Sequence, residues 1–558
     1  MAGRELRGSR AVTPAPGAPA PPPDAAAAEV PPAARPPALA FLRRYWPAAI
    51  AAAAMIAAGL WGLARDSSMG NDEVATRWAA SLSLGQLAHL LRNIDVVHGA
   101  YYLLMHVWMA IGTSPTALRI PSVIAMAVAV ALVAIIGRQL TGSGWAGLFA
   151  GLVTATTPAM SYYAQTARSY ALVFACVTAS SVILVKALKS EAPGTGAPGT
   201  GAPGTGTRPW WLAYGALIMV SGYLNELALL VLTAHAVTVL LARPGWPAIR
   251  RWAVAGAVGA VLVVPVVVVS SQEAAAVTWI ARPDRASLAL QFHDYFGIQP
   301  EISAALIICI VIALLPPLRR GGAAAAWWRG GGVSVQSVAA PLMILPAALL
   351  IAESLVARPF YVDRYVLYGE AGAALLAGAG AYRVGQWLRA GLRWPLLVAV
   401  PGVALVVCAL VLQLGGQRFD RTPASRAFDF GGSSRFVGEH ARAGDGVLYF
   451  GAFYRKASLG YPADFRKVSD FGVAISPRAS GTFQGINRPF SALRPLMLRY
   501  QRIWVVGQAP QLQRPPGLMK SESQELRQNF TQAAWTRFHG VTVTLWVKRP
   551  ASRGAASP

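Results

Sequence analysis

The stretch PAAIAAAAMIAAGLWGLARDSSMGNDE, residues 47–73, decides how the rest of the chain is interpreted. Its first part, Pro47 to Ala64, is an apolar run close to the ~20 residues that an α-helix needs to cross a bilayer. Arg43 and Arg44 precede this run, so charge bias predicts a cytoplasmic N-terminus and an outer exit. The stretch ends on two adjacent carboxylates, which we therefore expect at the outer membrane surface.

The composition is that of a polytopic membrane protein. Of the 558 residues, 55% are hydrophobic and only 13% are charged. Lys and Arg outnumber Asp and Glu by 25, but they lie in short clusters between apolar segments, which excludes a nucleic-acid-binding domain. Only six of the 49 basic residues are Lys, which indicates a high-GC bacterial genome, and we expect an actinobacterial source. Cys176, Cys309 and Cys408 lack metal-site spacing and are expected to be inert thiols.

Eleven membrane-spanning helices are predicted from the apolar runs. They lie at about 47–64, 117–137, 144–160, 168–187, 209–223, 224–242, 252–271, 301–318, 337–356, 365–384 and 394–414. Threading them with the N-terminus inside places the arginine clusters in the cytoplasm and most acidic residues outside, as expected for a multi-pass protein of the cytoplasmic membrane. Leu84–Leu91 and Gly99–Ile111 are too short to span, and we interpret them as helices in the outer interface.

We expect four regions along the chain. Residues 1–40, rich in Ala, Pro, Gly and Arg, are predicted to be a disordered cytoplasmic tail, and residues 41–415 to be the transmembrane catalytic domain. Within that domain, residues 188–208 are a low-complexity cytoplasmic linker that repeats Ala-Pro-Gly-Thr-Gly. Residues 416–558 are predicted to form a small extracytoplasmic α/β domain, with strands near 446–450, 502–507 and 541–547 and helices near 433–442 and 522–535.

Asp72 and Glu73 are the candidate catalytic residues. A carboxylate at this position can accept the proton of an acceptor hydroxyl, provided that burial raises its pKa from ~3.9. The alternative is a solvated pair of loop carboxylates, which is common in proteins. The pair by itself therefore does not establish a site.

Two arginines flanked by aromatic residues are candidate ligands for a lipid phosphate. Arg168 lies between Tyr163 and Tyr170, and Arg364 precedes Tyr365, each at the predicted outer end of a span. For Arg168, the alternative is an interfacial aromatic belt with one snorkelling arginine. For Arg364, the alternative is a structural ion pair with one of three carboxylates: Asp363, Glu353 or Glu226.

Further candidates for substrate contacts lie in other predicted outer segments. Trp279 belongs to a loop that could cover a sugar site as a partly mobile lid. Asn225-Glu226 lies at a turn between two spans, where helix capping explains the pair at least as well as catalysis. Tyr101, Tyr102 and His106 belong to an interfacial segment, where such side chains suit the headgroup layer.

In their order along the chain, these elements resemble a known family. The order is Asp72-Glu73, Tyr101-Tyr102-Leu103-Leu104 with His106, Leu118-Arg119-Ile120-Pro121-Ser122 with Gly137-Arg138, Tyr163 to Tyr170, and Arg364-Tyr365. This series is similar to that of GT-C glycosyltransferases of the protein O-mannosyltransferase and aminoarabinose transferase type, over roughly residues 45–415. The chain departs from that pattern at Asp95-Val96-Val97-His98-Gly99, where many relatives have a proline-rich stretch, and at Asn225-Glu226.

The resemblance implies an inverting transfer of a sugar, expected to be mannose, from a polyprenyl-phosphate donor to a hydroxyl of a protein, lipid or polysaccharide. On this interpretation Asp72 is the base, Glu73 positions the acceptor or a divalent cation, and Arg168 and Arg364 bind the donor phosphate. No cofactor is required, and a divalent cation, if one takes part, would be held by Asp72 and Glu73. Two alternatives stay open: a transporter or flippase of lipid-linked sugars, and a non-catalytic membrane protein that binds wall polymers.

Overall fold

The computed structural model describes residues 37–64, 68–191, 208–273, 278–316, 332–513 and 519–550. Two compact units divide the chain, Met1–Arg44 and Tyr45–Pro558, and the described part of the first is the start of helix α1 (Pro37–Leu60). The Ala-Pro-Gly-Thr-Gly repeats and most of the predicted N-terminal tail lie outside the described residues. The structural statements below concern the second unit.

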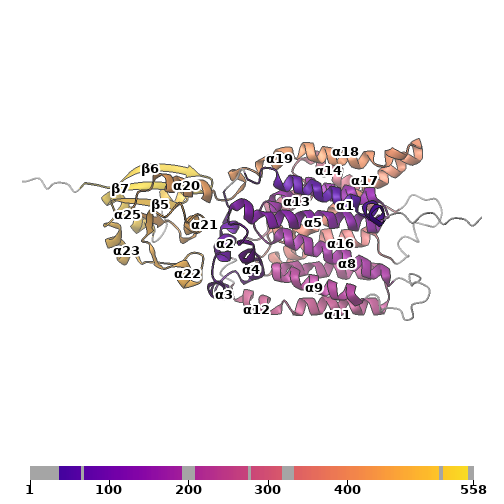
Figure 1. Cartoon of the computed structure of the whole chain (residues 1–558), viewed down its shortest axis with the longest axis horizontal. Helices are drawn as coiled ribbons and strands as arrows, with labels where there is room; N and C mark the ends of the chain where they lie inside the picture. Colours follow the sequence, from indigo (N-terminus) through magenta and orange to yellow (C-terminus); the bar gives the residue numbers. More distant parts are fainter. Residues whose placement is uncertain are drawn as a thin grey trace, which may run out of the picture. The chain divides into compact units, whose positions relative to one another are not determined.

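A bundle of long helices forms the larger part of this unit (Figure 1). A helix lies in each of the eleven predicted ranges. These helices are α1, α5 (Pro115–Thr141), α6 (Gly144–Thr156), α8 (Tyr170–Ser190), α9 (Arg208–Leu224), α10 (Val231–Ala242), α11 (Trp246–Val261) with α12 (Val264–Gln272), α14 (Pro300–Leu314) preceded by α13 (Arg285–Phe296), α16 (Val335–Val356), α17 (Glu370–Leu392) and α18 (Val400–Leu412).

By length and composition, α5, α8 and α16 are apolar enough to cross a membrane. The pairs α11–α12 and α13–α14 bring the number to five if each bent pair is counted as one span, with bends of 42° and 69°. Four further apolar helical stretches, among them Arg44–Leu60 of α1, have only 10–17 residues each. The structure thus contains helices suited to a membrane, while the count of eleven spans stays a prediction.

Small residues allow the helices of the bundle to approach one another closely. Helix α5 packs between α6 and α8, and α17 packs against α6, α14 and α16. A Cβ built on Gly380 of α17 would overlap the carbonyl oxygen of Cys309 in α14. A Cβ on Gly137 of α5 would lie 2.9 Å from the Cα of Gly147 in α6. Such contacts between backbones are typical of helices that pack in lipid.

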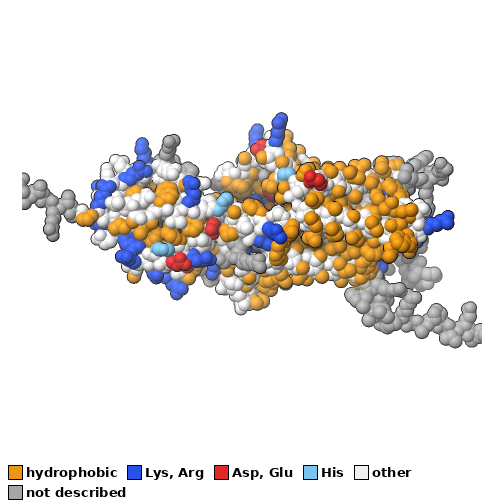
Figure 2. All heavy atoms as spheres, turned by 90° about the horizontal axis from the view of Figure 1, so that it is seen from above, with side chains coloured by type: hydrophobic (Ala, Val, Ile, Leu, Met, Phe, Trp, Pro, Cys, Tyr) orange, Lys and Arg blue, Asp and Glu red, His pale blue; other side chains and the backbone are white. Residues whose placement is uncertain are grey.

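The solvent-exposed sides of the bundle helices are apolar. Figure 2 shows hydrophobic side chains covering the helical part on the face drawn. The exposed apolar side chains include Ile124 and Val128 of α5, Val254 and Val258 of α11, and Val403 and Val407 of α18. A soluble monomer rarely exposes apolar surface on this scale, so this surface is suited to lipid.

Short helices precede and interrupt the bundle. They are α2 (Asn71–Ala80), α3 (Leu84–Leu91), η1 (Val96–His98), α4 (Gly99–Trp108), α7 (Pro158–Ala164), η3 (Glu226–Leu230) and η5 (Asp363–Gly369). The two segments predicted as interfacial helices are helices α3 and α4, and α4 ends three residues earlier than expected. Ser83 begins α3 with a capping box, in which its hydroxyl accepts from the backbone N–H of Gln86. Leu84 and Val107 are exposed, which leaves apolar side chains of α3 and α4 available to an interface.

The C-terminal part contains a five-stranded sheet in the order β2-β1-β5-β7-β6. Its strands are β1 (Asp445–Tyr449), β2 (Val468–Asp470), β5 (Arg502–Gly507), β6 (Phe530–Phe538) and β7 (Val541–Lys548). A two-stranded sheet joins β3 (Val473–Ile475) to β4 (Ile486–Asn487). The helices and turns of this part are α19 (Leu414–Phe419), η7 (Pro423–Ser425), α20 (Phe430–His440), η8 (Ala452–Arg455), α21 (Lys456–Gly460), α22 (Pro477–Ser480), α23 (Phe490–Met497), α24 (Ala509–Gln513) and α25 (Met519–Asn529), whereas η6 (Pro395–Val398) lies between α17 and α18 of the bundle.

One secondary-structure prediction in this part is wrong. The helix expected over 522–535 ends at Asn529 as α25, and β6 begins at Phe530. The reason is the hairpin that follows, in which β6 pairs antiparallel with β7. Gly540 lies in the turn with φ +68°, a left-handed conformation that glycine adopts without the cost of a Cβ.

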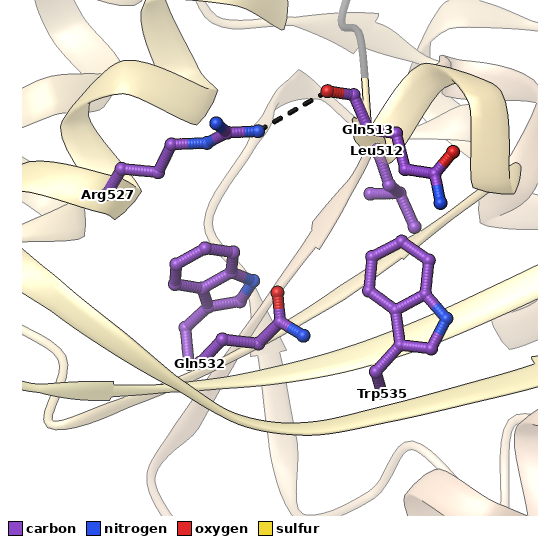
Figure 3. A pocket seen from close by; sticks show the side chains of 6 residues that line it. Leu512, Gln513, Arg527, Gln532 and Trp535 are labelled. Carbon is purple, nitrogen blue, oxygen red and sulfur yellow. Dashed lines mark hydrogen bonds between the residues drawn. The ribbon is translucent and has the colours of Figure 1, made fainter.

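An open cleft of about 360 Å³ lies on this sheet (Figure 3). The pairing of β6 with β7 shifts in register between Gln532 and Ala534, which inserts Ala533 as an extra residue. Residues three apart on a regular strand point to opposite faces, whereas a bulge brings Gln532 and Trp535 to the same face. The cleft is lined by Leu512, Gln513, Arg527, Gln532, Trp535 and Trp546. None of these six is a residue predicted to take part in catalysis or donor binding.

Candidate functional site

Asp72 lies in the first turn of α2, where the exposed N–H groups of a helix favour a negative charge. Its side chain is 32% exposed, and its Oδ2 lies 3.9 Å from Nη2 of Arg364. The side-chain amide of Asn71 donates to its Oδ1 at 3.2 Å. The carboxylate is therefore held beside a cation from a distant part of the chain and stays accessible to a substrate.

The pKa of Asp72 differs from the sequence expectation. Burial alone raises it, as expected, but the positive charges of Arg168, Arg364 and Lys456 outweigh burial and lower the pKa to about 2. The condition that burial raises the pKa is therefore not met, because the sequence did not show how many cations surround this carboxylate. Asp72 is ionised at neutral pH.

Glu73 is buried and fully engaged with the protein. Its Oε1 accepts from Arg119 Nε at 2.8 Å and from the backbone N–H of Ala167 at 2.9 Å. Its Oε2 accepts from Arg119 Nη2 at 2.9 Å and from the backbone N–H of Gly70 at 3.0 Å. A carboxylate has about four acceptor positions, and these four bonds occupy them. Glu73 thus joins α2 to α5 and to the segment before α8.

The pKa of Glu73 reflects this environment. Burial raises it, but the charges of Arg119 and Arg426 and the hydrogen bonds to the carboxylate lower it to about 2. Glu73 is therefore ionised, and its charge is balanced inside the protein.

Arg168 lies in the turn between α7 and α8 and is 5% exposed. Its Nη1 donates to the phenolic oxygen of Tyr102 at 2.9 Å, and the hydroxyl of Tyr102 donates to Asp95. Within the described part of the chain, its Nε has no hydrogen-bond partner. A buried guanidinium N–H without a partner is costly, which indicates a ligand position.

Arg364 lies in η5 among aromatic rings. Its Nε donates to the hydroxyl of Tyr170 at 2.9 Å. Its guanidinium carbon lies 5.6 to 5.8 Å from the ring centroids of Tyr170, Tyr365 and Trp279. Its carboxylate neighbour is Asp72, which is not one of the three partners weighed from the sequence. The structure thereby brings the first acidic pair and both predicted arginines together.

Asp95 and His98, which sequence reasoning did not select, belong to the same cluster. Asp95 has φ 70°, an uncommon conformation for a residue other than glycine, and Glu273 accepts from its backbone N–H at 2.7 Å. The Nε2 of His98 lies 3.9 Å from Asp95. Burial and the charge of Arg168 lower the pKa of His98 to about 4, so this ring is neutral at physiological pH. The signal that could have identified both residues is the departure from the family pattern at 95–99.

Lys456 is the other residue that sequence reasoning missed. It comes from α21 of the C-terminal part, yet its Nζ donates to Oδ1 of Asn71 at 2.6 Å. The two residues are 385 positions apart, and no motif connects them. One weak signal exists, since Lys is rare in a chain whose basic residues are nearly all Arg.

The remaining predicted residues have structural partners or frame the cluster. Asn225 caps η3, because its side chain accepts from the backbone N–H of Leu227 at 3.0 Å. This is the helix-capping alternative that was weighed against catalysis from the sequence. Three others form hydrogen bonds: Glu226 accepts from Ser270, His106 bonds the carbonyl of Ala80, and Tyr163 donates to Asp363. Tyr101 is fully buried, and the ring centroids of Tyr365 and Tyr170 are 6.4 Å apart. Trp279 is 61% exposed beside Arg364.

No group of three or more His, Cys, Asp or Glu side chains that could hold a metal ion is found among the residues that the structure describes. Of the two carboxylates to which a divalent cation was assigned, only Asp72 retains acceptor capacity. The use of a metal stays untested.

Solved structures with a similar fold include ArnT from Cupriavidus metallidurans. The apo structure matches with a TM-score of 0.53 at 13% identity, over 91% of this chain and 98% of that one. The fold is ArnT-like. A second ArnT structure, bound to undecaprenyl phosphate, gives a TM-score of 0.52 at 14% identity over the same shares. No family model and no curated protein matches the sequence.

An archaeal oligosaccharyltransferase, AglB from Archaeoglobus fulgidus, in complex with an inhibitory peptide and a dolichol-phosphate, matches with a TM-score of 0.46 at 10% identity, over 90% of this chain and 74% of that one. The resemblance predicted from the order of motifs is confirmed for the fold by the similarity to ArnT. The sugar and the acceptor are outside what such a similarity shows.

Proposed function

We propose that the protein is a membrane glycosyltransferase that moves a sugar from a polyprenyl-phosphate donor to a hydroxyl acceptor at the outer face of the cytoplasmic membrane. The observation that carries the proposal is the cluster of Asp72, Arg168 and Arg364, in which an accessible carboxylate lies beside two cations. The ArnT-like fold supports it, because one ArnT structure is bound to undecaprenyl phosphate. Mannose is the donor sugar to test first.

The reaction assigns one role to each member of the cluster. Asp72 accepts the proton of the acceptor hydroxyl, whose oxygen attacks the anomeric carbon as the bond from that carbon to the phosphate oxygen breaks. The electron pair of that bond leaves with the polyprenyl phosphate, and the anomeric configuration inverts. Arg168 and Arg364 stabilise the charge that grows on the departing phosphate.

The low pKa of Asp72 is compatible with a base role in the complex with the donor. A group with a pKa near 2 is a weak base at neutral pH. The two guanidiniums are the proposed phosphate ligands, and together with Lys456 they lower this pKa. The phosphodiester of a bound donor carries one negative charge, which offsets part of this positive charge and raises the pKa of Asp72 from its low value. The donor thereby activates the base that will act on the acceptor.

Glu73 is proposed as a positioning residue. Its four bonds connect the start of α2 to Arg119 and to Ala167, one residue before Arg168. Glu73, which was expected from the sequence to position the acceptor or a divalent cation, therefore fixes the position of Asp72 relative to Arg168.

The test is incubation of the purified protein in detergent with radiolabelled polyprenyl-phosphate mannose and candidate acceptors. Release or transfer of the sugar by the wild type, and its loss in Asp72→Asn with unchanged thermal unfolding, is the expected result. A general base contributes roughly 10²- to 10⁴-fold to the rate, which sets the expected loss. Near-wild-type turnover by Asp72→Asn would refute the base. Movement of labelled lipid across liposomes without cleavage would instead identify a flippase.

A further inference from the structure

The C-terminal part makes direct contacts with the segment that carries Asp72. Tyr461 accepts from the backbone N–H of Met69 at 2.6 Å, and Arg77 of α2 donates to the carbonyl of Gly460 at 2.5 Å. The rings of Trp78 and Phe483 pack at 5.4 Å. The C-terminal part is therefore held against α2 by polar contacts at α21 and by an apolar contact at Phe483.

Lys456 is the first residue of α21 and is buried by these contacts, with 9% of its surface exposed. Its ammonium lies 5.1 Å from the ring centroid of Phe453 and 5.2 Å from that of Phe483. Its polar partner is the neutral side chain of Asn71, at 2.6 Å. Among the residues that the structure describes, it forms no ion pair within 4 Å and has two further N–H donors without a protein acceptor.

A buried ammonium without a direct counter-charge is costly and is seldom retained for stability alone. Here the carboxylates that act on it are Asp72 on α2 and Asp95 before η1, and Arg168 opposes them. The ammonium is therefore placed at the edge of the same charged cluster as the two arginines.

We infer that Lys456 is a third ligand of the donor phosphate, supplied by the C-terminal part, so that the donor site is complete only when α21 is docked on α2. This inference rests on the proposed glycosyl transfer. It assigns to the C-terminal part a direct share in the donor site.

A count of charges supports the assignment. Arg168, Arg364 and Lys456 contribute three positive charges, and Asp72 and Asp95 contribute two negative ones. The pair Glu73–Arg119 balances itself, the charges of Glu273 beside Asp95 and Arg426 beside Glu73 offset each other, and the His98 ring is neutral. The donor phosphodiester adds one negative charge, which brings the sum to zero.

The charge stays balanced after transfer. Asp72 has then accepted the acceptor proton and is neutral, while the departing phosphate monoester carries a charge of about −2. The sum is again zero. Without Lys456 the cluster would carry one excess negative charge at both stages, which would weaken donor binding and oppose departure of the phosphate.

The ionisation of Lys456 offers a specific readout. Burial lowers its pKa from 10.5 to about 8, and the charges of Asp72 and Asp95 limit the fall. The kcat/KM for the donor reports ionisations of the free enzyme. We expect wild-type kcat/KM to fall as the pH rises through about 8, because Lys456 loses its proton. Lys456→Arg keeps its charge at that pH and should lack this alkaline fall.

Lys456→Gln should raise the donor KM roughly 10- to 100-fold at pH 7, the loss expected for one hydrogen bond to a charged group. Lys467→Gln is the matched control, since Lys467 is exposed in the same region and donates to the carbonyl of Gly438 at 3.0 Å. An unchanged donor KM in Lys456→Gln, or the same change in both variants, would overturn the inference. If Lys456→Gln does not fold, an alkaline fall that persists in Lys456→Arg overturns it.

Binding of polyprenyl phosphate alone separates this inference from the proposed function. Weaker binding by Lys456→Gln than by Lys467→Gln supports the third ligand even if no sugar is transferred. Equal binding by both variants contradicts it. Absence of transfer by the wild type, with intact phosphate binding, would instead refute the glycosyltransferase.

Discussion

Replacing Glu73 by Gln tests whether this carboxylate organises the site or contacts the substrate. The substitution keeps the size of the side chain and removes its charge. Of the four hydrogen bonds that Glu73 accepts, a Gln oxygen can keep two. The new amide would face N–H donors, and Arg119, only 1% exposed, would become a buried cation without its counter-charge.

The expected loss of stability follows from this geometry. Removing one partner of a buried ion pair costs about 3–5 kcal/mol, because the other charge stays buried. A folded domain is stable by about 5–15 kcal/mol, so the loss is large. Asp72→Asn is the matched control at the neighbouring position. Its ion pair is partly exposed and 3.9 Å long, and such pairs contribute about 0–1 kcal/mol.

The assay is unfolding of the purified variants in one detergent, followed by tryptophan fluorescence, together with sugar transfer. Glu73→Gln should unfold far more easily than the wild type, and Asp72→Asn should unfold like the wild type without transferring sugar. Combining Glu73→Gln with Arg119→Met should cost less than the sum of the two single changes, since no unpaired charge remains. If Glu73→Gln were as stable as the wild type yet inactive, Glu73 would contact the substrate and the positioning role would be refuted.

Three further predictions concern the donor site, acid stability and helix packing. Arg364→Lys should raise the donor KM about tenfold, because a Lys ammonium cannot bond Tyr170 and bind a phosphate in the way that the forked guanidinium can. The control Arg358→Lys, at an exposed arginine, should leave the donor KM unchanged. Equal KM values in the two variants would exclude Arg364 from the donor site. The pKa of Glu73 is about 2 in the folded protein, against an ordinary 4.5, so ionised Glu73 should contribute about 3 kcal/mol to the free energy of unfolding. This contribution should be complete above pH 4.5 and lost as the pH falls through 2. A Glu73→Gln variant that lost as much stability in acid as the wild type would contradict this. Gly380→Val should lower the free energy of unfolding by about 1–3 kcal/mol or more, because the added side chain would force α17 away from α14. A variant as stable as the wild type would show that the two helices do not approach so closely.

The helices of the bundle could be predicted because their signal is local. A run of apolar residues such as 117–137 carries its own evidence for a helix, and α5 covers that range. The hairpin of β6 and β7 was harder to predict, because the polar segment 522–535 has no apolar periodicity that distinguishes a helix from a strand. Pairing with β7 decided the strand, and such pairing is set by residues that follow in the sequence.

Asp72, Arg168 and Arg364 could be selected from the sequence because each lies at a predicted outer end of a span. Membrane topology restricts such ends to one side and brings them close together. Their environment could not be predicted in the same way. The base role of Asp72 was predicted on the condition that burial raises its pKa, but the cations around it lower that pKa to about 2.

The amino-acid sequence by itself determined which segments of this protein avoid water, because apolar character is a property of each run of residues. It also predicted that Asp72, Arg168 and Arg364 lie at the same ends of those segments. Only the tertiary structure decided that Arg119 neutralises Glu73 and that Lys456, 385 positions away, reaches Asn71. The physical reason is that electrostatic energy depends on distances in space, which the folded chain sets between residues remote in sequence.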